Sequence, residues 1–212
     1  MTLPQKRLGL LIVVSGPSGS GKTTLCRKAA DAGEAIFSVS CTTRAPRPGE
    51  VSGKDYFFVS ESEFQEKIKA GELFEYAEVH GRWYGTLKSF VIDNLKRGMD
   101  VFLDIDVQGA AQVRACDDEI LKKCHLDVFI LPPSVEELRN RLAGRGTEDA
   151  AAFELRMTNA IAEMEHWSEY DYALVSSTRE EDEKRFRALL TAERMRTGLI
   201  TRGEPQLRGV PS

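Results

Sequence analysis

The sequence predicts an α/β protein in which helices cover a parallel sheet. Short apolar segments, typical of strands buried on both faces, alternate along the chain with amphipathic segments of helical period. The first apolar segment, residues 8–14, leads into a glycine-rich turn and then a helical segment, as in parallel α/β folds. A chain of 212 residues is long enough for one core with smaller elaborations.

The remaining strands are predicted from short apolar or alternating segments bounded by turn residues. In chain order, we expect them at residues 36–41, 56–59, 73–79, 101–106, 128–131 and 173–175. Residues 44–55 are dense in proline, glycine and charge, so they are predicted to form a loop.

Two of the predicted helices begin at capping boxes, Ser60 with Glu63 and Ser134 with Glu137. The other helices are expected at residues 22–32, 89–96, 150–165 and 179–196. Residues 198–212 are expected to form a flexible C-terminal tail.

Composition and charge exclude several classes of protein. The 29 Lys and Arg against 33 Asp and Glu give a net charge of −4, which is unlike a general nucleic-acid binder. No apolar run approaches the roughly 20 residues of a membrane helix, and no secretory leader is apparent. The four cysteines form no CxxC pair, so we expect reduced thiols and a cytoplasmic location.

The glycine-rich turn matches the phosphate-binding pattern GxxxxGK[ST], and it stands between a strand and a helix as that pattern requires. Glycines let backbone N–H groups surround phosphate oxygens, and the positive end of the following helix adds to the attraction. Lys22 would bridge the terminal phosphates, and the Thr23 hydroxyl would bind Mg²⁺. The alternative is a chance glycine turn. The predicted ATP-binding residues of this loop are Gly16, Pro17, Ser18, Gly19, Ser20, Gly21, Lys22, Thr23 and Thr24.

Two carboxylates end an otherwise apolar segment. Asp104 and Asp106 are two residues apart, so a continuous strand would place them on one face. Charges on a buried strand need a partner or a cation, and Asp104 could hold the Mg²⁺ of a nucleotide through water. The alternative is a solvent-facing edge strand.

Several arginines could bind phosphate. Arg44 and Arg47 lie in a proline-stiffened loop, while Arg141, Arg145 and Arg156 lie at and beyond the end of the helix that follows Ser134. Guanidinium groups bind phosphate oxygens through paired N–H donors. Each arginine taken alone fits a solvated surface charge better than a phosphate ligand.

Glu75 is expected to share a strand face with apolar neighbours, so its carboxylate needs a donor partner. The adjacent N–H donors of a guanine ring match the two oxygens of a carboxylate, and adenine lacks this donor pair. Tyr84 and Thr86 offer hydroxyl groups nearby in the sequence. An internal salt bridge to Glu75 remains an equal alternative.

These segments, in this order and spacing, resemble the guanylate kinase family over residues 8–190. The motifs that carry the resemblance are GPSGSGKT, SCTTRAPRPGEVSGKDYFFV, FEYAEVHGRWYGT, LDIDVQG and PPSVEELRNRLAGRGTE. The second motif is more specific than the phosphate-binding loop, which many nucleotide-binding proteins share.

The resemblance implies a P-loop NTPase core with a parallel sheet flanked by helices, a GMP-binding α+β insertion and a helical lid. The implied core comprises residues 1–38, 91–133 and 166–197, the GMP-binding region 39–90 and the lid 134–165. It also implies a GMP site made of Ser40, Arg44, Arg47, Tyr56, Glu75, Tyr84, Thr86 and Asp106.

Within that site, the resemblance assigns the phosphate to Arg44, Arg47, Tyr56 and Tyr84, and the base to Ser40, Glu75 and Thr86. Asp104 and Asp106 would serve the metal and the GMP side of the cleft. The lid arginines Arg141, Arg145 and Arg156 would close over ATP and, with Lys22, Arg44 and Arg47, would assist the transfer.

The implied reaction is transfer of the γ-phosphoryl group of ATP to GMP, and to dGMP, with Mg²⁺, in purine nucleotide metabolism. A monomer or small homo-oligomer is expected. The sequence departs from many relatives at Thr86, where they have serine, and near Ser177, where they have an adenine-contacting asparagine. Two alternative hypotheses are a P-loop kinase that acts on a ribose bisphosphate, and a guanylate-kinase-like module that binds peptides without catalysis.

Overall fold

The computed structural model describes residues 6–79, 81–143 and 150–201. At its centre is a five-stranded sheet whose strands are all parallel, in the order β10-β9-β2-β8-β3. The strands are β2 (Leu11–Ser15), β3 (Ile36–Phe37), β8 (Val101–Asp104), β9 (His125–Leu131) and β10 (Tyr172–Val175). The predicted α/β class is therefore confirmed, and the apolar run of residues 11–14 is fully buried in the central strand.

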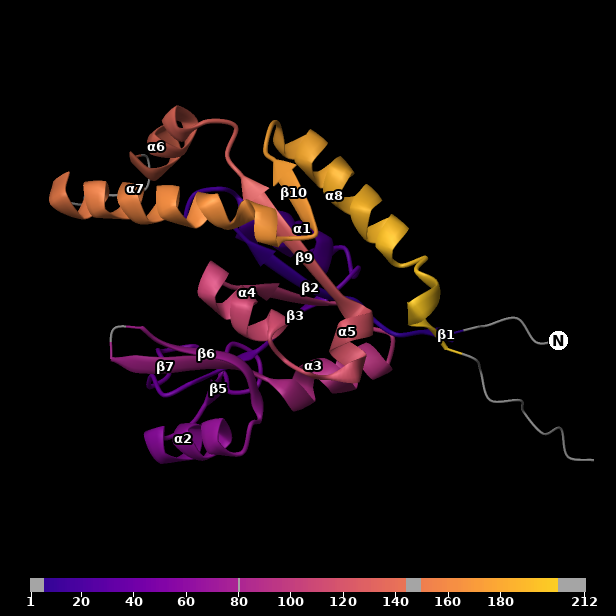
Figure 1. Ribbon diagram of the computed structural model, residues 1–212. Coiled ribbons are helices and arrows are strands. Elements are labelled where there is room, and N and C mark those ends of the chain that lie inside the picture. The colour runs from indigo at the N-terminus through magenta and orange to yellow at the C-terminus, as the bar shows by residue number, and fades with distance from the viewer. Residues whose placement is uncertain (1–5, 80, 144–149, 202–212) are drawn as a thin grey trace, which may run out of the picture.

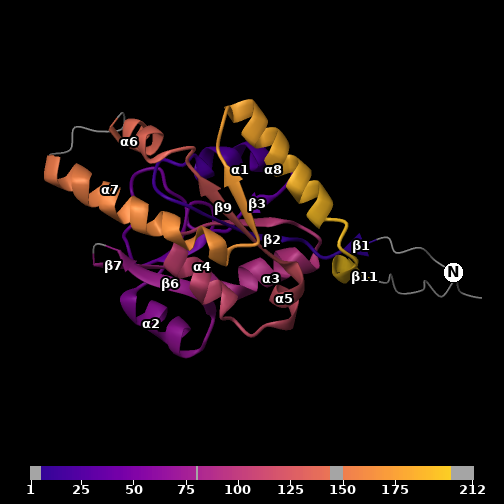
Figure 2. The same ribbon diagram turned by 45° about the horizontal axis from the view of Figure 1, so that its top comes forward.

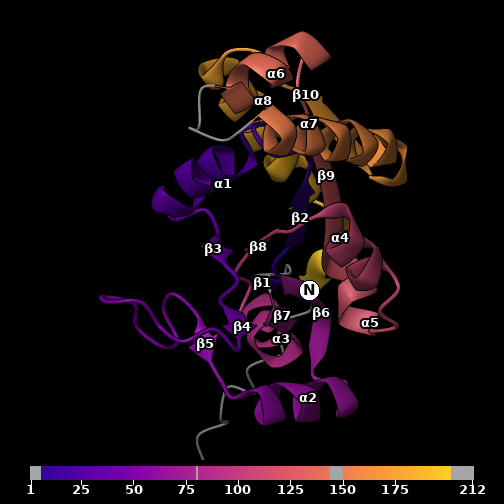
Figure 3. The same cartoon turned by 90° about the vertical axis from the view of Figure 1, so that its left-hand side faces the viewer.

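Helices cover both faces of this sheet, as Figures 1 and 3 show. Helix α1 lies on one side together with α8, and α4 and α5 lie on the other with α3 beside them. Their bounds are α1 (Lys22–Asp31), α3 (Lys88–Lys96), α4 (Val107–Arg114), α5 (Glu119–Cys124) and α8 (Arg179–Glu193). Within the described residues, no helix combines the length and apolar character needed to cross a membrane.

A second, four-stranded sheet, in the order β5-β4-β7-β6, carries Ser40, Glu75, Tyr84 and Thr86 of the predicted GMP site. Its strands are β4 (Ser40–Thr42), β5 (Phe57–Phe58), β6 (Leu73–Val79) and β7 (Arg82–Leu87), and helix α2 (Glu61–Lys69) packs on it. Fully buried Phe64 of α2 stacks on Trp83 at 5.9 Å. The capping box of Ser60 and Glu63 is present, as predicted.

Apart from shifts of one to three residues at strand ends, two predicted strands differ from the structure. The strand expected at residues 36–41 is two strands, because the chain leaves the core sheet after Phe37 and joins the second sheet at Ser40. The strand expected at residues 101–106 ends at Asp104, because Asp106 instead caps helix α4 by accepting a hydrogen bond from the Gly109 N–H. The two carboxylates therefore do not share one strand face.

Helices α6 (Val135–Ala143) and α7 (Ala150–Met164) form a separate pair that projects from the core (Figure 2). Leu138 and Leu142 of α6 pack against Met157 and Ala160 of α7. The predicted cap is present, since Ser134 accepts a hydrogen bond from the Glu137 N–H. This small cluster holds the pair together independently of the main core.

The two ends of the described chain meet beside the core. Strands β1 (Lys6–Arg7) and β11 (Ile200–Thr201) pair antiparallel, and the 3-10 helix η2 (Thr197–Leu199) precedes β11. The sequence predicts a flexible tail that begins at residue 198, but residues 198–201 instead form the end of η2 and strand β11, because the Leu199 side chain is fully buried in the core. The rest of that tail, residues 202–212, lies outside the described residues.

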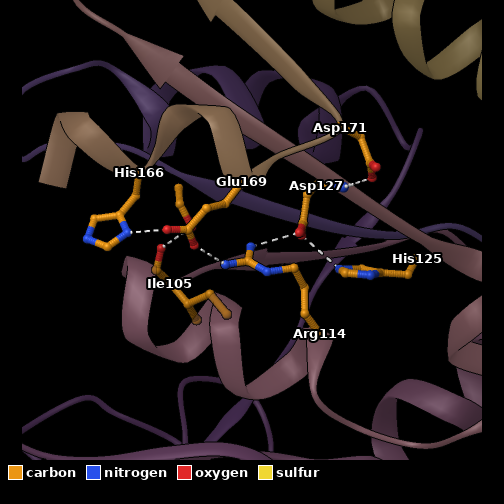
Figure 4. Close-up of polar contacts among 8 residues, drawn as sticks. Ile105, Arg114, His125, Asp127, His166, Glu169 and Asp171 are labelled. Carbon is orange, nitrogen blue, oxygen red and sulfur yellow. Dashed lines mark hydrogen bonds and ion pairs between the residues drawn. The ribbon is translucent and has the colours of Figure 1, made fainter.

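A set of polar contacts fixes the base of α7 against the core (Figure 4). Arg114, the last residue of α4, donates hydrogen bonds to Asp127 and to Glu169, both at 2.9 Å. Asp127 is only 2% exposed and also contacts His125 at 2.7 Å. Glu169 belongs to the 3-10 helix η1 (Glu165–Glu169), which directly follows α7. Arg114 thus links α4, the sheet and the end of α7.

Candidate active site

The predicted phosphate-binding loop joins β2 to α1 at the carboxyl edge of the core sheet, where open α/β sheets bind ligands. Gly16, Gly19 and Gly21 adopt φ values of 141°, 87° and 101°, which favour glycine. A Cβ at Gly16 would stand 2.3 Å from the Ile130 carbonyl oxygen. The N-cap residue of α1 is Gly21, which has no side chain that could accept from the first N–H groups of the helix. Both observations fit a backbone shaped to bind an anion.

Lys22 lies in this loop as predicted, and its ammonium group donates to the carbonyl oxygens of Gly16 at 2.5 Å and Pro17 at 3.2 Å. Thr23 donates to the Asp104 carboxylate at 2.5 Å. The structure therefore brings Thr23 and Asp104 together, although β8 and α1 are far apart in sequence. A hydroxyl and a carboxylate are hard oxygen donors of the kind that Mg²⁺ prefers.

A cavity of about 310 Å³ surrounds these groups. Its lining includes Lys22, Thr23, Asp104 and Asp106, and also Glu163 from helix α7. Burial raises the pKa of Glu163, an effect partly offset by the Lys22 charge. Sequence reasoning missed Glu163, because nothing in the alanine-rich pattern of α7 indicates which of its residues meets the phosphate-binding loop.

A second cavity, of about 490 Å³, lies on the other side of the loop. The predicted residues that line it are Gly19, Ser20, Gly21, Thr24 and Arg141, joined by Ser177. Thr178, Arg179 and Asp182 at the start of α8 also line it, and sequence reasoning missed them. The Thr178 cap of α8 was the available signal, since a helix start at a strand end faces the ligand edge of the sheet.

The lid arginines are only partly placed. Arg141 donates to Glu137 at 2.8 Å and to Ser176 at 3.1 Å, which holds its guanidinium at the rim of the larger cavity. Arg156 lies on α7 and is not among the residues that line either cavity. Arg145 lies outside the described residues.

On the acceptor side, Glu75 of β6 is 8% exposed and accepts a hydrogen bond from Thr86 of β7 at 2.6 Å. Burial raises the pKa of Glu75, Thr86 partly offsets this, and the Asp106 charge raises it further. In the described part of the chain, no Lys, Arg or His forms a salt bridge with Glu75 and no residue donates to its second oxygen. The alternative of an internal salt bridge therefore finds no support there.

Ser40 lies opposite Thr86 in the register of β4 and β7, so the three residues expected to read a base lie in neighbouring strands. Asp106, at the start of α4, is close enough to influence Glu75 electrostatically. Helix α4 packs on β6, and a Cβ at Gly109 would stand 3.4 Å from the second Glu75 oxygen. The absence of a side chain at Gly109 thus leaves room beside this carboxylate.

The predicted phosphate-binding side chains Arg44, Tyr56 and Tyr84 also come together. The Arg44 guanidinium lies 5.3 Å from the Tyr56 ring centroid, and the Tyr56 and Tyr84 rings are 6.0 Å apart. Arg47 lies in the same loop with an exposed side chain. Sequence reasoning missed Glu50, whose carboxylate contacts Arg44 at 2.8 Å.

Comparisons with known proteins identify the family of this chain. The family model described as guanylate kinase matches residues 9–193. A guanylate kinase of Ruegeria pomeroyi is 45% identical over 90% of this chain and 88% of its own length, and one of Novosphingobium aromaticivorans is 46% identical over 96% and 92%. A crystal structure of guanylate kinase from Anaplasma phagocytophilum superposes with a TM-score of 0.68 at 36% identity, covering 92% of this chain and 90% of that one. The chain belongs to the guanylate kinase family.

Proposed function

We propose that this chain transfers the γ-phosphoryl group of ATP to a phosphate oxygen of GMP, giving ADP and GDP. The observation that carries the choice of acceptor is Glu75, a buried carboxylate with one oxygen held by Thr86. A guanine ring presents adjacent N–H donors to such a carboxylate. A ribose bisphosphate offers no such donor pair, so the alternative sugar-phosphate kinase is disfavoured.

The acceptor phosphate is assigned to Arg44, Arg47 and Tyr56 of the loop between β4 and β5, and to Tyr84 of β7. Its oxygens are already anionic at neutral pH, so the reaction needs no dedicated general base. The main obstacle is repulsion between two polyanions. Guanidinium and ammonium groups oppose that repulsion by neutralising charge at the point of transfer.

The donor triphosphate is assigned to the loop of residues 16–24, with Lys22 beside its terminal phosphates. Thr23 and Asp104 would hold Mg²⁺, directly or through water, and the metal would neutralise charge on the phosphate oxygens. The described residues contain no group of three or more His, Cys, Asp or Glu able to hold a metal. Two oxygen donors suit an ion that arrives with the nucleotide and keeps several water ligands.

We assign residues 39–90 to acceptor binding and residues 134–165 to a lid that carries Arg141, Arg145 and Arg156. Closure of the lid on the bound acceptor would limit transfer to water. Use of dGMP, a role in purine nucleotide metabolism, a cytoplasmic location and a monomer or small homo-oligomer stay predictions.

The test is a coupled ADP-release assay with ATP and Mg²⁺ against GMP, dGMP, AMP, UMP and ribose bisphosphate. We expect release to require a guanine nucleotide and to fall on the order of 10²–10³-fold in Lys22→Ala. Lys67→Ala is the matched control, because Lys67 of helix α2 pairs with Glu72 and lines neither of the two cavities. Removing Mg²⁺ with a chelator is expected to abolish release.

The other readings make different predictions in the same assay. Release with ribose bisphosphate and not with GMP would support a kinase of the alternative class. Nucleotide binding without transfer to any acceptor would support the peptide-binding module.

A further inference from the structure

Glu50 lies in the loop of residues 43–56, the acceptor loop, and has no role in the reaction outlined above. Both of its carboxylate oxygens contact Nη2 of Arg44, at 2.8 and 3.0 Å. One of them also accepts a hydrogen bond from the Arg47 backbone N–H at 2.7 Å. A single carboxylate therefore joins the two arginines assigned to the acceptor phosphate.

Other groups also hold the Arg44 side chain. Its Nη1 donates to the Ala45 carbonyl oxygen at 2.8 Å, and its guanidinium lies 5.3 Å and 5.8 Å from the ring centroids of Tyr56 and Phe58. Arginine has five N–H donors, so the contacts with Glu50 and Ala45 do not use all of them. The Arg44 side chain is 16% exposed, which is low for a charge in a loop.

Within residues 45–49 of this loop, few other hydrogen bonds order the chain. Residues 45–49 are exposed, and the turn is closed by a hydrogen bond from the Glu50 N–H to the Arg47 carbonyl oxygen at 3.1 Å. A free arginine side chain loses about 2 kcal/mol of rotamer entropy when it is ordered. An anion built into the loop lets that ordering occur during folding, before a ligand binds.

Glu50 could instead compete with a ligand for Arg44, since a carboxylate and a phosphate attract the same donors. The geometry favours positioning for two reasons. Glu50 contacts only Nη2 of the three guanidinium nitrogens of Arg44, so the Nε–H is not used by this carboxylate. It also anchors the Arg47 backbone, which a ligand anion would have no need to displace.

We propose that Glu50 is a positioning residue that presents Arg44 and Arg47 to the acceptor phosphate. This inference rests on the proposed assignment of those arginines to GMP. In this role Glu50 would act through the arginines and not on a substrate, so its removal would weaken capture of the phosphate and leave the transfer step largely intact.

The test compares Glu50→Gln with the parent by steady-state kinetics in both substrates. We expect KM for GMP to rise about tenfold, the effect of losing one charge-assisted hydrogen bond, while kcat and KM for ATP change little. The inhibition constant of guanosine, which has no phosphate, should stay unchanged. Asp55→Asn is the matched control, because Asp55 accepts from the Val51 N–H in the same loop and does not contact either arginine.

Arg44→Gln and the double variant separate this inference from the assignment beneath it. If neither Arg44→Gln nor Glu50→Gln changes KM for GMP, the assignment of the arginines has failed. If only Arg44→Gln changes KM for GMP, the assignment of the arginines stands and the positioning role of Glu50 has failed. The positioning role has also failed if the effects of the two single variants on KM add up in the double variant, because Glu50 would then act independently of Arg44. A lower KM for GMP in Glu50→Gln would show that Glu50 competes with the phosphate for Arg44. Equal losses in kcat, guanosine affinity and melting temperature would show that Glu50 has only a structural role.

Discussion

The molecule has two loops suited to phosphate, and they are built differently. The loop of residues 16–24 relies on its backbone: its glycines adopt positive φ, and Gly16 is pressed against the core strand β9. The acceptor loop of residues 43–56 relies on side chains, with Arg44 held by Glu50 and two aromatic rings. One loop is shaped by the fold and the other by charge pairing.

The difference has consequences for how each loop responds to change. Backbone geometry fixed by a packed core is sensitive to added volume and indifferent to salt. A partly exposed ion pair tolerates added volume and is weakened by ionic strength. We therefore expect steric changes to damage the first loop and changes of charge at constant shape to damage the acceptor side.

The largest effect is expected for Gly16→Ala. Its φ of 141° is strained for alanine, and the new Cβ would stand 2.3 Å from a backbone oxygen. Strain and overpacking together should reduce the free energy of unfolding on the order of 4 kcal/mol and remove ATP binding. Urea unfolding and nucleotide titration measure the two losses.

Gly49→Ala in the acceptor loop is the matched comparison. Gly49 also has a positive φ, of 90°, but no atom lies within 4 Å of the position of a new Cβ. We expect a loss of only about 1 kcal/mol from backbone strain. Equal losses in the two variants would mean that the two loops do not differ in the way argued above.

The next largest effect is expected for Glu75→Gln, which preserves shape and removes charge. The amide can still accept from Thr86, but its NH₂ group would face one guanine donor, so kcat/KM for GMP should fall about 10²-fold. Since the substitution also removes a buried charge, we expect no loss of melting temperature. A normal kcat/KM would remove the basis for guanine selection.

A smaller effect is expected from pH in the parent protein. Burial raises the pKa of Glu75, so on acidification its carboxylate takes up a proton at a higher pH than an ordinary glutamate. Protonation removes a hydrogen-bond acceptor for the guanine donors, so KM for GMP should rise as the pH falls through the raised pKa of Glu75. This rise in KM should be smaller than the rise in KM caused by Glu75→Gln. The GMP phosphate also titrates near pH 6. The Glu75→Gln profile reports the phosphate alone, and identical profiles would contradict the assignment.

The comparison also explains how far the sequence could predict the structure. The phosphate-binding loop follows from a local pattern, since glycine spacing and the flanking strand and helix specify the backbone. The core strand at residues 11–14 and the capped helix after Ser60 were predictable for the same reason. Each depends on neighbours in the sequence.

The features that were missed depend on pairing across the fold. In the sequence, Glu50 is one of several charged residues in a polar loop, and nothing in the pattern predicts a partner for it. The folded turn brings its carboxylate to Arg44. Asp106 has the strand spacing of Asp104, but the start of α4 takes its side chain as a cap. Glu163 meets the phosphate-binding loop because α7 folds back over it. None of these partners follows from periodicity.

The smallest effect is expected at Thr86, and it tests whether a hydroxyl rather than a shape serves the acceptor side. Thr86 is 1% exposed and donates to Glu75 at 2.6 Å. Thr86→Ser keeps that hydrogen bond and removes one methyl group, so kcat/KM for GMP should change about twofold or less. Thr86→Val keeps the shape and leaves the Glu75 oxygen without its donor, so we expect a loss of about tenfold, measured in the same assay. If Thr86→Ser reduced kcat/KM as much as Thr86→Val, packing around the methyl group would matter more than the hydroxyl. The contrast between a loop that depends on backbone shape and a site that depends on side-chain chemistry would then not extend to β7.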